Sequence, residues 1–509
     1  MYVNAGGNLD IHGANKLSWT QLATTLKPQE NTYEYMLQLV DKPTGWKAGD
    51  MLVIASTDFD MNQAEEVEVI SCDPYSGLTF CTCKVKGEIR YTHYGEIYKG
   101  IDMRAEVGLL TRNIKIYGDM KDENDTYGGH MKAFEGFETF RIRGAEFTKM
   151  GHKGIKGRYP IHWHMAKTVD PTKTYAIDNS LHHLFQRCIT VHGTHGVTVE
   201  NNVAYNTFGH CYFLEDGGEK NNTLHHNLGL VTKIGTTIPS DRRPSTFWIT
   251  SPLNILTENH AAGSFGVGIW YIFAEDVTGP SAQEDFFQHG EAFRTEILTF
   301  EGNTVHSNLH TGFFFGHHLM PDQDFNGPGG TNYCDPRVDP LDPDSPPGHN
   351  IVKDLTAFKN IEQNTWNDCR YTTYDDFKSA DAILGISMAH DGELTNSIFI
   401  GESNNLGEPN LVKLRNKTEV MWHRSTPVWH AQHDTYIGIQ LYDGNPYVHG
   451  NTFADFYDDA FKVAGGIGFR KPHAGEWPTL FMNSIFDYSD GAQGNYVHGS
   501  ERDVFGGHG

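Results

Sequence analysis

Three histidines and an acidic pair occupy matching positions in short strand-like segments of the chain. The runs YPIHWHM, RCITVHG and HCYFLEDG carry His162, His164, His192, Glu215 and Asp216. Laid over one another, the runs bring His164, His192 and Glu215 into one column. Successive coils of a parallel β-solenoid stack about 4.8 Å apart, so residues far apart in sequence become neighbours at ligand distance. The pattern predicts a site at which imidazoles and carboxylates converge.

A divalent metal ion is the first chemistry that this column could support. Two of His162, His164 and His192 together with Glu215 offer the nitrogen and oxygen ligands that suit Zn²⁺, Mn²⁺ or Fe²⁺. Calcium is the alternative ion, and it would need more oxygen ligands, such as Asp216 and backbone carbonyls. Two interpretations without a metal stay open: a hydrogen-bonded histidine ladder that supports the sheet, and a set of acid–base residues.

Hydrolysis of a glycosidic bond is the second chemistry that these residue types allow. It usually requires two carboxyl groups about 5 to 9.5 Å apart, one of them protonated to assist the leaving group. Glu215 with Asp216 or Asp241 supplies such a pair. Because adjacent strand residues point to opposite faces, Asp216 can join Glu215 only where the chain turns, as the two glycines after Asp216 allow.

β-Elimination from a uronic acid is the alternative reaction. A cation must neutralise the sugar carboxylate while a base removes the proton from C5. Lys132 or Arg158 could supply the cation, and a neutral His192 could act as the base. Spacing in the sequence does not choose between the two reactions, so the candidate catalytic residues are Glu215, Asp216, His192 and Lys132.

Alternation along the strands places flat rings on the same outer face as the histidines. In YPIHWHM, Ile161 and Trp163 would face the core, which turns the two histidines outward. Sugar rings pack their C–H faces on exposed aromatic rings, and an elongated face suits a polymer. The candidate substrate-binding residues are Phe213, Trp248, Trp270, His130, Arg158 and Arg242.

The charge of the protein limits its partners. With 64 acidic and 40 basic residues, the chain carries a net charge of −24, which argues against nucleic acid or an anionic membrane surface as a partner. An acidic polysaccharide would need a local basic patch. Candidates for that patch surround the histidine-rich segment: Lys132, Lys153, Lys156, Arg158, Lys167, Lys233, Arg242 and Arg243.

The remaining sequence predicts an all-β protein. Its 54 glycines, 12% aromatic residues and 20% charged residues are typical of strands separated by many turns. Residues 1–120 predict a small β domain that caps a solenoid, and later residues predict coils of roughly 20 to 30 residues with long loop inserts. Asn202, Asn227, Asn259 and Asn303 mark one bend, where asparagine tolerates a left-handed turn and can bond its equivalent on the next coil.

A few segments predict other features. Residues 281–295 are the best helical candidate, and the Pro- and Gly-rich run 321–350 predicts a projecting loop. No apolar run approaches the roughly 18 to 20 residues that a membrane span needs. Because Met1 leads straight into strand-like sequence without a signal-peptide core, we expect a piece of a longer secreted or anchored protein. Cys188 and Cys211 share a column, which predicts either a disulfide or two buried thiols.

A series of longer motifs resembles one family. In chain order, from about residue 9 to residue 444, these are HGANKLSWTQL, WKAGDMLVIASTD, QAEE, GIDMRAEVGLLTRNI, GRYPIHWHM, CITVHG, GHCYFLEDG, IPSDRR, STFW and GIQLYDG. They resemble the family of the cell migration-inducing hyaluronidase and the cell-surface transmembrane hyaluronidase, with a more distant likeness to fibrocystin-like proteins. The resemblance implies a partial G8-type β domain at residues 1–120 and a right-handed parallel β-helix at residues 121–500.

The resemblance also implies a function. It implies an extracellular or cell-surface protein that binds hyaluronan and depolymerises it, with a requirement for a divalent cation. We therefore expect a hyaluronidase-like glycoside hydrolase, with a polysaccharide lyase as the second choice. A glycan-binding or adhesion ectodomain without turnover is the alternative. The assignment of His162, His164, His192 and Glu215 as metal ligands rests on the stacking of the strands and not on the resemblance.

Overall fold

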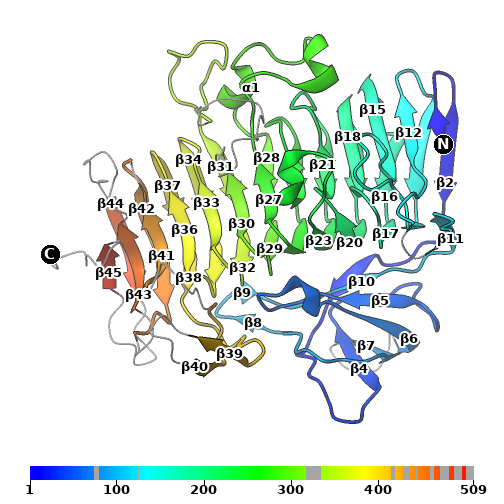
Figure 1. Cartoon of the computed structure of the whole chain (residues 1–509). Helices are drawn as coiled ribbons and strands as arrows, with labels where there is room; N and C mark the ends of the chain where they lie inside the picture. Colours follow the sequence, from blue (N-terminus) through cyan, green and yellow to red (C-terminus); the bar gives the residue numbers. More distant parts are fainter. Residues whose placement is uncertain are drawn as a thin grey trace.

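Parallel strands stacked one coil above the next form the body of the molecule. The computed structural model describes residues 1–73, 80–122, 125–316, 334–413, 419–427, 435–442, 444–458, 463–469, 481–486 and 496–499. Figure 1 shows the coils following one another from the blue and cyan strands at the N-terminal end to the red strands near the C-terminus. The predicted solenoid is therefore continuous along the whole long axis of the protein.

Two long parallel sheets line the coils. One has 13 strands and carries the predicted site. In spatial order its strands are β1 (Tyr2–Val3), β12 (Met131–Phe134), β15 (Ile161–Thr168), β18 (Ile189–His195), β21 (Tyr212–Leu214), β24 (Ser245–Ile249), β27 (Val267–Tyr271), β30 (Thr311–Phe315), β33 (Gln363–Asn367), β36 (Leu384–Met388), β41 (Thr435–Leu441), β43 (Val463–Phe469) and β45 (Tyr496–Gly499). The prediction of an all-β, right-handed parallel β-helix is confirmed.

The second long sheet has 22 strands and closes each coil. Its members beside the site are β13 (Thr139–Arg143), β14 (Ala145–Thr148), β16 (Thr174–Ile177), β17 (Ser180–His182), β19 (Thr198–Glu200), β20 (Val203–Phe208), β22 (Thr223–His225), β23 (Leu228–Lys233), β25 (Ile255–Thr257) and β26 (His260–Ser264). Between the two sheets, Trp163, Ile189, Tyr212, Phe247 and Ile269 are buried in one apolar core. The prediction that these side chains point into the core is thus confirmed.

A ladder of asparagines forms the bend between strands of the second sheet. The side-chain amides of Asn202, Asn227 and Asn259 each donate to the next asparagine oxygen along the axis, at 2.9 to 3.0 Å. The left-handed backbone conformation belongs to the preceding residue, for example Asn201 with φ 54° and His226 with φ 52°. The predicted bonding between coils is confirmed, but the predicted left-handed turn lies one position earlier, because the ladder asparagine points into the coil.

A separate antiparallel sheet of six strands packs beside the β-helix (Figure 1). Its strands in order are β3 (Trp19–Gln21), β10 (Glu106–Leu109), β5 (Met51–Ile54), β6 (Glu65–Asp73), β7 (Cys81–Lys86) and β4 (Glu34–Leu39). Trp19 stacks on His226 of the β-helix with ring centroids 4.1 Å apart, and Glu106 contacts His260 Nδ1 at 2.6 Å. The sheet lies within the predicted 1–120 domain, whereas β1 pairs with β12 in the first coil. Its assignment as a G8-type domain stays a prediction.

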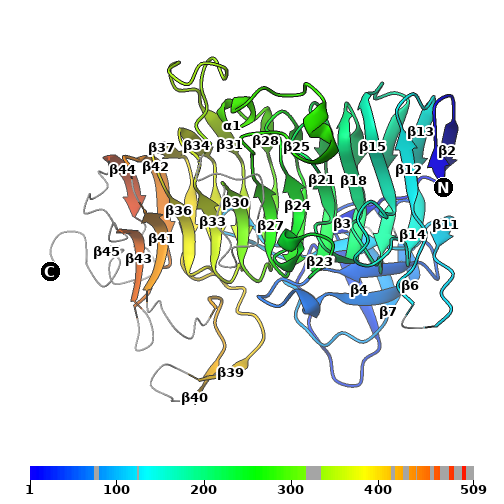
Figure 2. The ribbon, with the colours of Figure 1, turned by 45° about the horizontal axis from the view of Figure 1, so that its top comes forward.

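The inserts between coils hold little helix. The predicted helical segment, 281–295, overlaps the end of the 3-10 helix η3 (Gly279–Gln283) and contains a single turn, α1 (Glu291–Arg294). A hairpin of β39 (Asn410–Lys413) and β40 (Glu419–Trp422) projects below the coils in Figure 2. Much of the predicted loop 321–350 falls outside the described residues. Among the residues that are described, no helix combines the length and the apolar character that crossing a membrane requires.

Disulfides link neighbouring segments. Cys188 and Cys211 are bonded between β18 and β21, which decides the alternative left open by the sequence in favour of a disulfide. Two further disulfides join Cys72 to Cys83 and Cys334 to Cys369. The first of the three fastens two coils that carry site residues, so it bears directly on the spacing of the site.

Candidate functional site

Strand register brings the predicted column together. His164 of β15 pairs with His192 of β18, and Val191 of β18 pairs with Leu214 of β21, so Glu215 follows beside His192. The Nδ1 atoms of His164 and His192 are 3.0 Å apart, and Glu215 Oε2 lies 3.5 Å from His192 Nδ1. The predicted alignment of these three side chains is confirmed.

His162 adds a third imidazole from the same outer face. Its ring centroid lies 5.9 Å from that of His192 and 5.0 Å from that of His164. The candidate ligand atoms of the three histidines all lie within 4.8 Å of one another, as do those of His192, Glu215 and Asp216. His162 is 1% and His192 is 3% exposed, whereas His164 is partly exposed. The cluster is therefore mostly buried, and His164 is its most solvent-accessible imidazole.

Backbone irregularities next to the cluster shape the ends of its strands. The register of β15 and β18 shifts between His164 and Lys167, where Met165 and Lys167 have φ of 52° and 58°. Gly193 also has a positive φ of 52°, and a Cβ there would lie 2.4 Å from Met165 Sδ. Glycine adopts this φ without strain and leaves room for the side chain of Met165 from the bulged strand. The pairing of the two strands is therefore interrupted directly after the paired histidines and resumes, in a shifted register, at Lys167 and Thr194.

Asp216 fixes the orientation of His192 and the position of its proton. Asp216 Oδ2 lies 2.5 Å from His192 Nε2 and accepts the backbone N–H of Ser281 at 3.1 Å. An ionised carboxylate only accepts, so Nε2 carries a proton and Nδ1 faces His164 and Glu215. Burial acts to lower the pKa of His192, but the hydrogen bond to Asp216 and the charge of Glu215 outweigh it and raise the pKa.

The two other histidines are neutral. Burial, with the charge of Lys132, lowers the pKa of His164 to about 4. Burial and the neighbouring His192 hold the pKa of His162 well below its ordinary value. Burial also acts on Asp216, raising its pKa, yet the hydrogen bond from His192 prevails and the pKa is lowered overall. Asp216 is therefore an ionised partner of an imidazole and not the protonated acid of a hydrolytic pair.

Several buried polar atoms around the cluster have no hydrogen-bond partner among the described residues. They are both ring nitrogens of His162, Oε2 of Glu215, the hydroxyls of Tyr159 and Thr190, and Nε of Arg187. Thr190 pairs with His162 across β15 and β18, and the Tyr159 ring lies 5.0 Å from the His162 ring. A buried polar group without a partner costs about 1–3 kcal/mol, so such groups are rare in folded proteins. Their concentration points to a place built for a polar ligand.

Two lysines bring positive charge to the carboxylate side of the cluster. Lys156 Nζ lies 3.5 Å from Glu215 Oε1. Lys132 of β12 pairs with His162 across the strands, and its amine lies 3.2 Å from where a Cβ on Gly157 would stand. Burial lowers the pKa of Lys132, against the opposing charge of Glu215. The structure thus places two of the predicted basic-patch residues, Lys132 and Lys156, at the site.

Arg158 and His130 form a second predicted group at the N-terminal end of the cluster. Arg158 Nη1 lies 2.8 Å from His130 Nε2 and donates to the hydroxyl of Tyr2 at 2.8 Å. Burial, followed by the charge of Arg158, lowers the pKa of His130 to about 4, so its Nε2 can accept from the guanidinium. Both side chains are partly exposed and remain candidates for substrate contact.

The prediction of an open aromatic surface is wrong for its three rings. Phe213, Trp248 and Trp270 are between 1% and 4% exposed and pack in one apolar cluster. The guanidinium carbon of Arg187 lies 3.8 Å from the centroid of Phe213, and the ring of His210 lies 4.0 Å from that of Trp248. Polar side chains thus lie on Phe213 and Trp248, and Trp270 packs against Trp248 and Phe314, so no sugar can stack on these rings in this conformation.

The predicted pairing of Glu215 with Asp241 is also wrong. Asp241 is fully buried, its Oδ1 lies 2.8 Å from Arg187 Nη1, and its Oδ2 accepts the backbone N–H groups of Thr237 and Ile238 at 3.1 Å. Asp241 therefore holds a turn together. The next residue, Arg242, is exposed at the end of the 3-10 helix η2 (Pro239–Arg242), and its contact with substrate stays a prediction.

Sequence reasoning missed a buried carboxylate behind the site. Glu219 Oε1 accepts the backbone N–H groups of Gly193 and Asp216 at 2.9 and 3.2 Å, and its Oε2 accepts that of Gly217 at 3.0 Å. Burial raises the pKa of Glu219. The signal was present in the run EDGGE, because a carboxylate three residues after an aspartate can close a tight glycine turn on itself. Glu219 fixes the backbone next to His192 and at Asp216.

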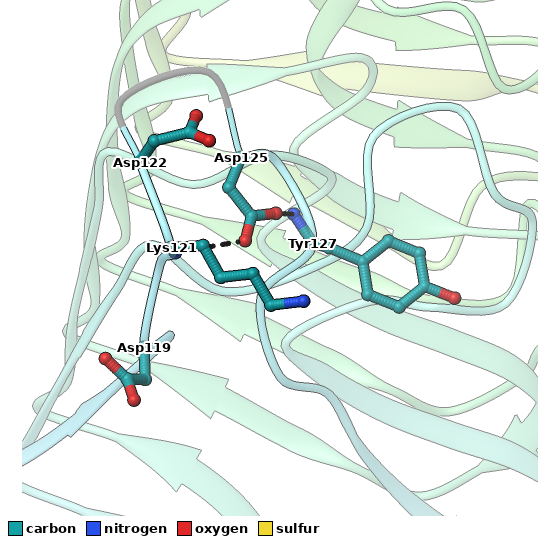
Figure 3. A pocket seen from close by; sticks show the side chains of 5 residues that line it. All are labelled: Asp119, Lys121, Asp122, Asp125 and Tyr127. Carbon is teal, nitrogen blue, oxygen red and sulfur yellow. Dashed lines mark hydrogen bonds between the residues drawn. The ribbon is translucent and has the colours of Figure 1, made fainter.

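A hollow of about 510 Å³ lies apart from this cluster (Figure 3). It is lined by Asp119, Lys121, Asp122, Asp125 and Tyr127, which follow β11 (Ile114–Tyr117). The carboxylate of Asp125 accepts the backbone N–H groups of Lys121 and Tyr127 at 3.2 and 3.0 Å. These bonds shape the loop, and no predicted site residue lines the hollow.

Comparison with known proteins agrees with the geometry. Residues 126–313, which include every residue of the cluster, match the CEMIP beta-helix family. The chain is 34% identical to the mouse "Cell migration-inducing and hyaluronan-binding protein" over 91% of its own length and 38% of the relative's. It is 34% identical to the human "Cell surface hyaluronidase CEMIP2" over 88% of its own length and 36% of the relative's. The predicted resemblance is confirmed.

The likeness covers most of this chain but only part of each relative. The chain spans less than two fifths of the length of these two relatives. Among solved structures, the catalytic domain of a GH87 alpha-1,3-glucanase in complex with nigerose is matched over 95% of this chain and 98% of that one, at 10% identity and a TM-score of 0.25. Because this TM-score is low, the fold is assigned from the strand pairing within the chain and not from this likeness.

Proposed function

We propose that the chain binds an acidic polysaccharide of the hyaluronan class at the cell surface or outside the cell and cleaves it at the histidine cluster. The observation that carries the proposal is the group of unpartnered buried polar atoms around His162 and Glu215. The relatives named for hyaluronan binding and for cell-surface hyaluronidase activity support the choice of polymer. The lysines beside Glu215 suit a substrate with carboxylate groups.

A divalent cation fits the donor set. The three histidines, whose ligand atoms lie within 4.8 Å of one another, would hold it, and Glu215, at 3.5 Å from His192 Nδ1, would be the fourth ligand. Imidazoles and a carboxylate are the ligands of Zn²⁺, Mn²⁺ and Fe²⁺. Asp216 accepts from the far nitrogen of His192, as carboxylates commonly do behind metal-bound histidines. Calcium is the less suitable ion, since three of the four donors are nitrogens. When bound, the ion would supply positive charge to polarise an oxygen of the substrate.

The protein side chains have separate tasks in this proposal. Lys132 and Lys156 bind a sugar carboxylate, and Arg158 and His130 extend that contact by one coil. Asp216 keeps the proton of His192 on Nε2, so the Nδ1 lone pair stays directed into the site. Burial of the cluster excludes bulk water, which strengthens each of these electrostatic contacts.

β-Elimination is the second candidate reaction, and a specific observation favours it over hydrolysis. Asp216 is ionised against His192 and Asp241 is paired with Arg187, so neither offers a protonated carboxyl beside Glu215. Elimination needs a cation and a base: Lys132 or Arg158 would supply the cation, and a neutral His192 would act as the base in a site that holds no metal ion. Incubation of the purified chain with hyaluronan decides the matter: new reducing ends alone identify hydrolysis, and unsaturated uronides identify elimination.

Binding without turnover is the remaining outcome. Metal-replete protein that binds hyaluronan and leaves its chain length unchanged over an extended incubation would establish a glycan-binding protein instead of an enzyme. His162→Ala is the variant that removes a residue of the cluster. His289→Ala is the control, because it removes a histidine from an exposed insert. The proposal predicts that only the first substitution abolishes cleavage.

A further inference from the structure

Two lysine amines lie close to the ring of Phe208 at one turn of the β-helix. Lys153 Nζ lies 5.1 Å and Lys233 Nζ lies 5.8 Å from the centroid of the Phe208 ring. Phe208 ends β20 and pairs with Lys233 at the end of β23, while Lys153 reaches the ring from the loop before β15. A lysine from the neighbouring strand and a lysine from a separate loop thus both lie near the same ring.

These two amines lack a counter-charge in the described part of the chain. No described carboxylate lies within 4.0 Å of either amine, although the protein as a whole carries a net charge of −24. Lys233 is partly buried, and burial lowers its pKa. Two like charges beside one ring repel each other, and the ring attracts each amine but neutralises neither. An anion that contacts both amines would supply the missing negative charge.

The loop that carries Lys153 also reaches the histidine cluster. Lys156, three residues further along, contacts Glu215 at 3.5 Å. A chain extends at most about 3.6 Å per residue, so the backbones at these two lysines lie within about 11 Å of each other. One short loop therefore carries both Lys153, beside Phe208, and Lys156, beside Glu215.

We propose that Lys153, Phe208 and Lys233 form an accessory subsite for a carboxylate-bearing sugar of the same polymer that enters the histidine cluster. This inference rests on the proposed function for the identity of the polymer. The two amines bind the carboxylate, and the ring of Phe208 supports both lysine side chains. The subsite raises affinity and positions the chain, and it takes no part in bond cleavage.

Binding measurements on the whole chain test the subsite. The probes are a hyaluronan oligosaccharide of defined length and the same oligosaccharide with its carboxyl groups reduced to alcohols. The variant is Lys153→Gln with Lys233→Gln, and the control is Lys84→Gln with Lys353→Gln, which removes the same charge from two exposed lysines paired with glutamates. We expect the subsite variant to bind the acidic oligosaccharide roughly tenfold more weakly, since two charge-assisted contacts are lost.

The further readouts separate the subsite from general electrostatics. The subsite variant should bind the reduced oligosaccharide as wild type does, and its affinity for the acidic one should depend less on salt. Phe208→Leu should weaken binding of the acidic probe as well, because the amines lose their common support. Equal losses in the subsite and control variants, or unchanged affinity in the subsite variant, overturn the proposal.

The outcome is independent of catalysis. A wild-type chain that binds the oligosaccharide without cleaving it refutes the proposed cleavage, and the variants still decide the subsite. A wild-type chain that cleaves hyaluronan while the subsite variant matches it in affinity refutes the subsite alone. Absence of binding by the wild type overturns both.

Discussion

Replacement of Asp216 by asparagine tests how the site controls His192. The carboxylate lies 2.5 Å from His192 Nε2, and both side chains are almost fully buried. Asparagine is of the same size and can still present an oxygen to Nε2–H and to the backbone N–H of Ser281, but it has no charge. We expect the affinity for a divalent cation to fall by about 10- to 100-fold, which is roughly 1.4 to 2.8 kcal/mol.

The two ends of that range have different structural causes. If the amide oxygen of Asp216→Asn keeps the hydrogen bond, only the charge is lost and the decrease lies near tenfold. If the amide turns its NH₂ group toward His192, the imidazole proton moves to Nδ1, and that nitrogen can no longer act as a ligand. The decrease then approaches a hundredfold. Nitrogen chemical shifts of His192 identify which of the two tautomers is present.

Competition titration with a chelator measures the affinity, and thermal unfolding of the metal-free forms measures stability separately. Asp119→Asn is the control, because it removes an equal charge from an exposed side chain. An unchanged affinity for the divalent ion in Asp216→Asn, with an intact fold, would refute the argument that this carboxylate orients a metal-bound imidazole.

Three further outcomes follow from the same contacts. Glu219→Gln should reduce cleavage of hyaluronan without changing the affinity for a reduced, neutral oligosaccharide, because it weakens the hydrogen bonds that hold the backbone next to His192. Equal decreases in the cleavage rate and in this affinity would contradict the expectation. Because the pKa of His192 is raised, the metal-free form holds a second proton on this imidazole below that pKa, so metal affinity should rise with pH and then level off above the pKa. Calorimetry in buffers of different ionisation enthalpy should detect a proton released when the metal binds. If no proton is released, the assignment of His192 as a ligand is contradicted. Asn227→Ala breaks bonds to Asn202 and Asn259 in the buried ladder and should lower the free energy of unfolding by roughly 2–4 kcal/mol. A loss below about 1 kcal/mol in denaturant melts, closer to the effect of a surface substitution, would contradict the ladder's role.

The column of site residues could be predicted because strand phase and coil stacking are properties of the sequence. Alternation placed Trp163 inside and His164 outside, and an equivalent alternation placed His192 outside in the next coil. Parallel pairing in register then had to bring the two imidazoles together. The same reasoning set Cys188 beside Cys211, where the structure has a disulfide.

The covering of the outer face could not be predicted in this way. A side chain that points outward from a strand is exposed only where no other segment packs on the sheet. The sequence does not show which loops fold back onto the sheet. Trp248 and Phe213 point outward as predicted, yet His210 and Arg187 lie against them. Asp241 was misjudged for the same reason, since its partner Arg187 is 54 residues away in sequence.

X-ray absorption spectroscopy of the metal-replete chain, expressed without a polyhistidine tag, tests the central claim most directly. We predict one divalent ion per chain with a shell of imidazole nitrogens and a carboxylate oxygen at about 2.0 to 2.2 Å. The shell should lose nitrogen ligands in His162→Ala and stay unchanged in His289→Ala. A chain that retains no ion in stoichiometric amount, or a shell made of oxygen alone, would contradict the assignment of His162, His164, His192 and Glu215 as one metal centre.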